Sequence, residues 1–99
     1  MARFDVYGNP SGLGHVLVIQ ADILSDLNTR TVVPLLPLAQ APTPAKRLNP
    51  IFEIGTTPHV MVTQFMAAVP RGVLGNPITN LARHDTDIAN AIDMLLIGF

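Results

Sequence analysis

The sequence predicts a mostly β fold: a small antiparallel β-barrel or curled sheet with one C-terminal α-helix. Residues 3–74 are short apolar segments separated by turns rich in glycine and proline, which is typical of short strands. Residues 85–99 carry apolar residues at helical spacing. The 99 residues are expected to form one domain, 1–99, because a chain of this size buries roughly 65% of its unfolded surface.

Residues 3–7 and 15–20 are the first two predicted strands. In the first, Phe4 and Val6 alternate with more polar residues, the pattern of a half-buried strand. The second is more fully apolar. The segment Gly8–Gly14 between them holds three glycines and a proline and is predicted to be a loop. The short connection indicates antiparallel pairing.

Residues 22–28 are predicted to form a turn or a single helical turn capped by Asp22. Residues 30–36 are the third predicted strand. Pro34 has no N–H to donate, so this strand is expected at a sheet edge or a bulge. Residues 37–50 contain four prolines and the basic pair Lys46 and Arg47, and are expected to be an exposed connection.

The second half of the sheet is predicted from shorter signals. Residues 51–54 and 59–63 are expected to form a hairpin around a turn at residues 55–58. Residues 64–68 show no clear pattern. Residues 69–74 are predicted as a short strand interrupted at Pro70, and residues 75–77 as a turn that leads through 78–84 to the helix.

The predicted helix runs from Asp85 to Phe99. Asp85 is expected to cap it, and Asp87 adds negative charge at the positive end of the helix dipole. One apolar face is formed by Ile88, Ala91, Ile92 and Leu95.

Residues 94–97 are consecutive apolar residues, so the last helical turn is apolar on every side. A domain of this size covers one face of such a helix, and Gly98 suits a helix end. We therefore expect the tip to lie in or beside a protein–protein interface. The alternative is a buried C-terminal helix with no further role.

Composition favours a second subunit. Apolar residues are 48% of the chain and charged residues 13%, about half the usual share. The mean hydropathy is +0.39. No apolar run approaches the ~18 residues that a membrane helix requires, so the excess apolar surface predicts a homodimer and no membrane partner.

Several function classes receive no support. The chain has no cysteine, which excludes disulfides and thiolate sites, and its amino terminus lacks the apolar core of a signal peptide. A cytoplasmic protein is expected. The net charge is −1 without a basic run, so direct nucleic-acid binding is not indicated.

No catalytic, metal or cofactor site is predicted. His15, His59 and His84 are the only histidines, and none is expected to pair with another at metal-ligand spacing. The arginines are expected on the solvated surface, as is His84. Ser11 and Ser25 are the only serines, and neither lies in a Gly-x-Ser-x-Gly motif.

Five blocks, in order along the whole chain, resemble the CcdB toxins of bacterial toxin–antitoxin modules. The blocks are Phe4–Tyr7, Val18–Leu24, Thr31–Leu35, Met61–Pro70 and His84–Phe99. The resemblance implies an SH3-like barrel, a homodimer and inhibition of DNA gyrase through its A subunit. Such toxins trap the gyrase–DNA cleavage complex by binding, without catalytic residues or a cofactor, and a CcdA-like antitoxin neutralises them.

The resemblance also implies site residues. The residues that match gyrase-binding positions are Ile23, Leu24, Asp93, Leu96, Ile97, Gly98 and Phe99. Together with the basic pair in the exposed connection, it suggests antitoxin contacts in two loops. The residues concerned are Gly8, Asn9, Gly12, Gly14, Lys46 and Arg47.

One position departs from the family pattern. Ile97 stands where well-studied members have a tryptophan, and Phe99 replaces the usual terminal isoleucine. Two other functions therefore stay open. One is an endoribonuclease toxin of the same fold, which would need clustered basic and acid–base groups such as Arg30, Arg71 and His59. The other is a non-toxic dimeric module whose tip only dimerises.

Overall fold

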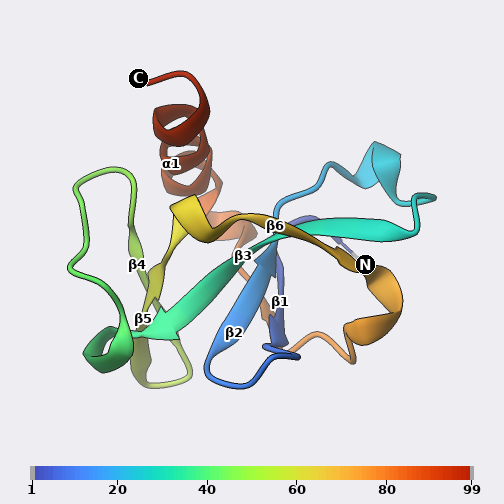
Figure 1. Cartoon of the computed structure of the whole chain (residues 1–99), viewed down its shortest axis with the longest axis horizontal. Helices are drawn as coiled ribbons and strands as arrows, with labels where there is room; N and C mark the ends of the chain where they lie inside the picture. The colour runs from blue at the N-terminus through green and yellow to red at the C-terminus, as the bar shows by residue number, and fades with distance from the viewer. Residues whose placement is uncertain (1, 99) are drawn as a thin grey trace.

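The computed structural model describes residues 2–98, and its element order confirms the predicted fold class (Figure 1). A seven-stranded antiparallel sheet curls into a nearly closed barrel and carries one C-terminal helix, α1 (Asp85–Leu96). The strands are β1 (Asp5–Gly8), β2 (His15–Val18), β3 (Thr29–Pro37), β4 (Ile51–Ile54), β5 (Thr57–Met61), β6 (Ala67–Pro70) and β7 (Thr79–Asn80). Short 3-10 helices are η1 (Asp22–Leu24), η2 (Leu38–Gln40), η3 (Thr63–Phe65), η4 (Arg71–Val73) and η5 (Ala82–His84).

The long strand β3 is central, so the predicted edge position of Pro34 is wrong. The sheet order is β4-β5-β3-β2-β1-β7, and β6 also pairs with β3. On the side away from β2, β3 pairs with β6 through residues 29–32 and with β5 through residues 35–37. Pro34 lies where the partner changes, and its carbonyl accepts a bond from the Val62 N–H at 2.9 Å. Since the N–H and C=O of a strand residue face the same side, the missing N–H costs no ladder bond there.

The β1–β2 pairing and the β4–β5 hairpin are confirmed, but other boundaries differ from the prediction. Ile54 pairs with Thr57, so the hairpin turn is tighter than predicted and Gly55 occupies it with φ +66°. The strand predicted at residues 69–74 is instead β6, which ends at Pro70 and is followed by η4. The segment without a clear pattern forms the end of η3 and the start of β6.

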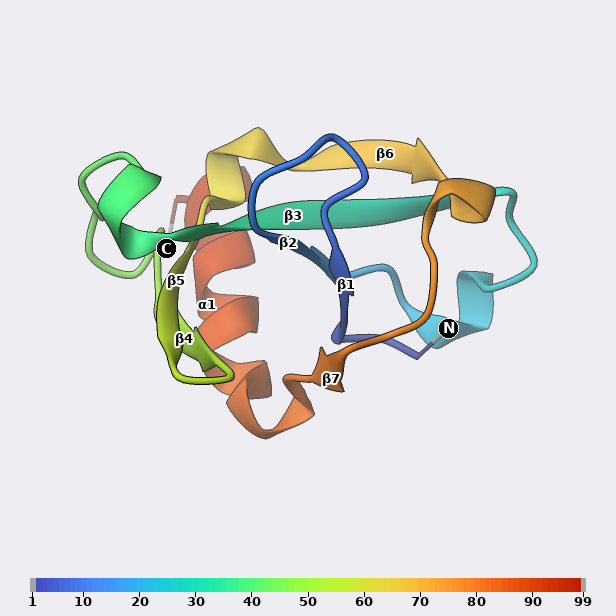
Figure 2. The same ribbon diagram turned by 90° about the horizontal axis from the view of Figure 1, so that it is seen from below.

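Helix α1 closes the barrel interior with part of its predicted apolar face. Ile88 and Ala91 are fully buried, whereas Ile92 is half-buried and Leu95 is exposed. Figure 2 shows α1 beneath β3 and beside the β4–β5 hairpin. The core cluster that includes these helix residues comprises Phe4, Val6, Leu17, Ile19, Val33, Leu35, Phe52, Ile54, Met61, Leu81, Ile88 and Ala91.

The ends of α1 also differ from the prediction. His84 is the N-cap, and no side chain among residues 2–98 caps the helix. Asp85 is therefore the first helical residue and not the cap, although Asp85 and Asp87 do lie in the first turn. The helix ends at Leu96. Gly98 has φ +94° and its N–H donates to the Asp93 carbonyl at 3.0 Å, a glycine termination. Phe99 lies outside the described residues.

Candidate partner-binding site

The 3-10 turn η1 and the tip of α1 rise from the same side of the sheet (Figure 1). The side chain of Ile23 is 90% exposed, and that of Leu24 is also exposed. The predicted helical turn is confirmed, but the predicted cap is wrong. Ala21 is the N-cap without a side-chain bond, and Asp22 Oδ1 instead accepts from the Arg3 N–H at 2.7 Å. This bond ties η1 to the amino-terminal segment.

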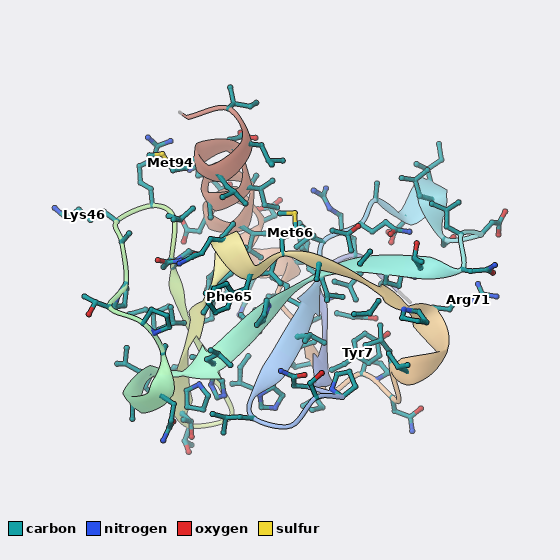
Figure 3. All side chains as sticks on the ribbon, viewed as in Figure 1. Tyr7, Lys46, Phe65, Met66, Arg71 and Met94 are labelled. Carbon is teal, nitrogen blue, oxygen red and sulfur yellow. The ribbon has the colours of Figure 1, made fainter. Side chains whose placement is uncertain are left out.

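The η1 segment is taken as residues 22–28, which comprise η1 and the turn that follows it. A groove of about 390 Å³ lies between this segment and α1. Its apolar lining consists of Ile19, Ala21, Leu24, Leu27, Met66, Ile92 and Leu96. Its polar lining consists of Arg3, Gln20, Thr29 and Thr31. Figure 3 shows Met66 projecting into the space between α1 and η1. The groove therefore includes Leu24 and Leu96, two of the residues predicted to bind gyrase.

The last turn of α1 is not covered by the described part of the chain. Leu95, Leu96 and Ile97 are 36%, 66% and 61% exposed. Asp93 and Gly98 are exposed beside them. Of the predicted gyrase-binding residues, Leu24 and Leu96 line the groove, whereas Ile23, Asp93, Ile97 and Gly98 are exposed outside its lining. Phe99 is not described.

Sequence reasoning missed several lining residues. Leu27 follows Leu24 by three residues within the η1 segment, a spacing that places both on one side of a helical turn. Ile92 is predicted on the core face, yet it is half-buried and reaches the groove. Met66 falls in the segment that shows no clear pattern, so only its tertiary position identifies it.

Two of the histidines, which are predicted to be unpaired, meet across the sheet. His15 Nδ1 lies 3.3 Å from His59 Nε2, and His59 Nδ1 donates to the Thr57 carbonyl at 2.9 Å. In the neutral tautomer of His59 that makes this bond, Nε2 is the acceptor for a His15 Nδ1–H. Burial, followed by the neighbouring His59, lowers the pKa of His15. Within residues 2–98, no group of three or more histidine, cysteine or acidic side chains could hold a metal ion.

The third histidine also departs from the prediction. His84 is half-buried, not solvated, and its ring centroid lies 4.9 Å from that of Phe52. It therefore packs on the β4 core residue at the start of α1.

The β1–β2 loop, predicted to bind an antitoxin, is held by Asn9. The Asn9 N–H donates to the Gly14 carbonyl and its Nδ2 to the Leu13 carbonyl, each at 3.1 Å. Gly14 backs directly onto β3, whereas Gly8 and Gly12 are exposed with open space around them. Figure 1 shows this loop at the end of the barrel opposite to the tip of α1.

The second predicted antitoxin region lies beside α1. Lys46 and Arg47 are exposed, and Arg47 lines a hollow of about 310 Å³ together with Pro50, Asp87 and Asn90. Figure 3 shows Lys46 on the same side of the molecule as Met94 of α1. The two predicted antitoxin regions therefore lie on separate surfaces of the molecule.

Of the residues that an endoribonuclease would need, Arg30 and Arg71 lie together, since both donate to the Ser25 carbonyl, but His59 lies far from them. Arg30 pairs with Val69 near one end of β3, and His59 pairs with Pro37 at the other end. Positions 30 and 37 are roughly 23 Å apart along an extended strand. Arg30 and His59 are both buried. For Arg30 this contradicts the expectation that the arginines are solvated.

No helix among the described residues is long and apolar enough to cross a membrane.

Comparison with known proteins agrees with this architecture. The family model described as CcdB protein matches residues 3–98. A solved structure described as an endoribonuclease in complex with its cognate antitoxin, from a mycobacterial species, superposes with a TM-score of 0.76. The match covers 97% of this chain and 94% of that one at 14% identity, a level that shows a shared fold.

Proposed function

The chain belongs to the CcdB family of toxins from toxin–antitoxin modules, and from this premise we propose that it binds the A subunit of DNA gyrase and traps the gyrase–DNA cleavage complex. The proposed action is inhibition by binding in the cytoplasm, without covalent chemistry. The proposed contact surface is the groove between η1 and α1 together with the exposed last turn of the helix.

The observation that carries this proposal is that Leu24 and Leu96 both line one groove. The family resemblance selected both residues independently of their positions in space. Protein–protein interfaces commonly combine an apolar core with a polar rim, and this groove has both apolar and polar lining residues. Exposed leucine and isoleucine side chains at its rim supply apolar area that a partner would bury, at about 25 cal/mol per Å².

Ile97 is proposed to reduce affinity without abolishing binding. The family tryptophan could stack on an arginine of the partner, an interaction that contributes ~0.5–2 kcal/mol. Isoleucine retains the apolar contact only. Since Ile97 is exposed, it is available for that contact.

The acting form is proposed to be a homodimer. Among the described residues, the segment before β6 leaves an aromatic side chain uncovered, since Phe65 is 53% exposed. Within residues 2–98, strand β6 pairs with β3 alone, so its other edge is available for a second copy. Sedimentation at micromolar concentration should give twice 10.6 kDa, and a stable monomer would contradict this part of the proposal.

The antitoxin partner is proposed to bind as a disordered acidic tail that orders on contact. The family supports such a partner, and the fold relative was solved with its own antitoxin. The exposed basic pair Lys46 and Arg47 suits acidic side chains. Amide exchange with and without antitoxin tests this, and unchanged exchange in both the 8–14 and 37–50 loops would remove them from the contact surface.

Messenger-RNA cleavage is the second candidate because the fold relative is described as an endoribonuclease. The separation and burial of Arg30 and His59 favour gyrase inhibition instead. Two assays on the same purified protein discriminate: inhibition of gyrase supercoiling and cleavage of RNA. Inhibition without cleavage supports the proposal, and the reverse result overturns it.

A further inference from the structure

We propose that Arg30 is a positioning residue that holds the η1 segment in its partner-binding conformation. This inference rests on the proposed function, because it concerns the surface formed by Ile23 and Leu24. Arg30 lies in β3 and is not among the residues that line the groove. Its action is therefore through the backbone of the η1 segment.

The side chain of Arg30 is only 4% exposed, and its guanidinium group binds three backbone carbonyls. Nη1 donates to the carbonyls of Leu27 and Thr29, each at 2.8 Å. Nη2 donates to the carbonyl of Ser25 at 2.7 Å. The three carbonyls belong to the stretch that runs from just after Leu24, where η1 ends, to Thr29, where β3 begins.

Two other residues, Arg71 and Gln20, also bind backbone carbonyls of this segment. Arg71 Nη1 donates to the Ser25 carbonyl at 3.3 Å, and the Arg71 N–H donates to the Asn28 carbonyl at 2.9 Å. Gln20 Nε2 donates to the Leu24 carbonyl at 3.0 Å, while its Oε1 accepts from the Thr31 N–H. Figure 3 shows Arg71 at the same end of the molecule as η1. Arg30 supplies the most buried and most numerous of these bonds.

The chemistry of the group explains why arginine occupies this position. A guanidinium is a planar fork with five N–H donors, so one side chain can bind several carbonyls that point inward from a tight turn. A lysine ammonium is a single point with a different reach and cannot reproduce this pattern. Each carbonyl that loses its partner in a water-poor site is left with an unmet hydrogen-bonding requirement. The turn can then adopt other conformations, in which these carbonyls bind water instead.

Such loosening has a specific kinetic signature. If only a fraction of molecules holds η1 in the binding conformation, the apparent dissociation constant rises by the inverse of that fraction. The loss appears mainly in the association rate, since the bound complex is unchanged. Removal of a contact residue instead raises the dissociation rate. The rate constants thus separate positioning from contact.

The test compares Arg30→Lys, Arg71→Ala and Leu24→Ala with the unaltered protein. Two quantities are measured: amide exchange across the chain, and the binding rates to the purified gyrase A subunit. Arg30→Lys should accelerate exchange about tenfold at residues 23–27, leave the β2–β3 and β4–β5 amides unchanged, and slow association about tenfold. Arg71→Ala, at an exposed residue, should show the same changes to a smaller degree. Leu24→Ala should mainly accelerate dissociation.

The outcomes separate this inference from the proposed function. Unchanged exchange at residues 23–27 in Arg30→Lys would overturn the positioning role of Arg30, whatever the protein binds. Local acceleration without a change in association rate would also overturn it. Failure of the unaltered protein to bind the gyrase subunit would overturn the proposed function, and the exchange data would then show only whether Arg30 orders the η1 segment.

Discussion

Leu24 and Leu96 line the same groove, one from the η1 turn and the other from the last turn of α1. The two residues are far apart in the sequence, and the fold brings both to the lining of this one groove. Neither is covered by the described core. This juxtaposition makes one apolar surface from two short exposed elements.

Deletion of residues 97–99 should abolish gyrase inhibition while the fold remains. Ile88 and Ala91 are fully buried and still anchor the helix, whereas Ile97 is exposed. Loss of a helix end that lacks buried contacts is usually mild. Supercoiling inhibition and the urea midpoint are the two measurements. A truncated protein that folds and inhibits as before would show that the tip is dispensable.

Gly98→Glu is the point variant for the same region. A side chain at φ +94° is strained, and the charge would stand in an apolar contact. A Cβ added at Gly98 would meet open space among the described residues, so inhibition should fall without a large loss of stability. Gly98→Ala is the matched control for the strain alone, and equal losses in the two variants would exclude a charge effect.

Ile97→Trp should strengthen gyrase inhibition by restoring the aromatic surface at the family's tryptophan position. A tenfold gain corresponds to ~1.4 kcal/mol. Because Ile97 is 61% exposed, the larger side chain meets no crowded core. The concentration for half-inhibition of supercoiling measures the gain, and an unchanged value would mean that position 97 is not a hot spot in this protein.

Gly14→Ala should destabilise the fold, whereas Gly8→Ala should not. A Cβ at Gly14 would overlap the Leu35 carbonyl oxygen, and its φ of +80° disfavours any other residue. These effects predict that the free energy of unfolding falls by at least ~2 kcal/mol. A Cβ added at Gly8 would meet no described atom within 4 Å, so this replacement should cost under ~0.5 kcal/mol. Equal urea midpoints for the two variants would contradict the close approach of the loop to β3.

The contrast between Gly14 and Gly8 illustrates what the sequence could and could not predict. Glycine content identified the loop, but only the pairing of β2 with β3 shows which glycine is sterically required. The same holds for Pro34, where local chemistry indicated an edge. A central strand tolerates this proline because two shorter strands share one side of β3.

The site was predictable where local pattern and family resemblance agreed. The apolar residues 94–97 predicted an uncovered helix tip, and the structure confirms the exposure of Leu96 and Ile97. Tertiary contacts were not predictable. Arg30 looks like a surface charge in sequence, yet it is buried because the η1 segment folds its carbonyls around the guanidinium.

Folding stability should fall as the pH drops through about 6.5, the ordinary histidine value. The pKa of His15 is lowered in the folded protein by burial and by His59, so the unfolded chain takes up the proton first. The stabilising contribution of neutral His15 is complete above its unfolded pKa and is lost as His15 binds a proton below that value. His15→Gln should show a smaller decrease in urea midpoint between about pH 7.5 and about pH 5.5. An equal decrease of the urea midpoint with pH in the unaltered protein and in His15→Gln would contradict a contribution of His15 to this pH dependence.

The most direct test of gyrase inhibition is a supercoiling assay with gyrase from the protein's own host. The proteins compared are the unaltered chain, Leu24→Glu and Leu96→Glu, with Gly8→Ala as a control outside the groove. We predict inhibition and accumulation of cleaved DNA for the unaltered chain and the control, and loss of both for the two groove variants while folding persists. No effect of the folded, unaltered protein at high concentration would contradict gyrase inhibition and favour a non-toxic dimeric module.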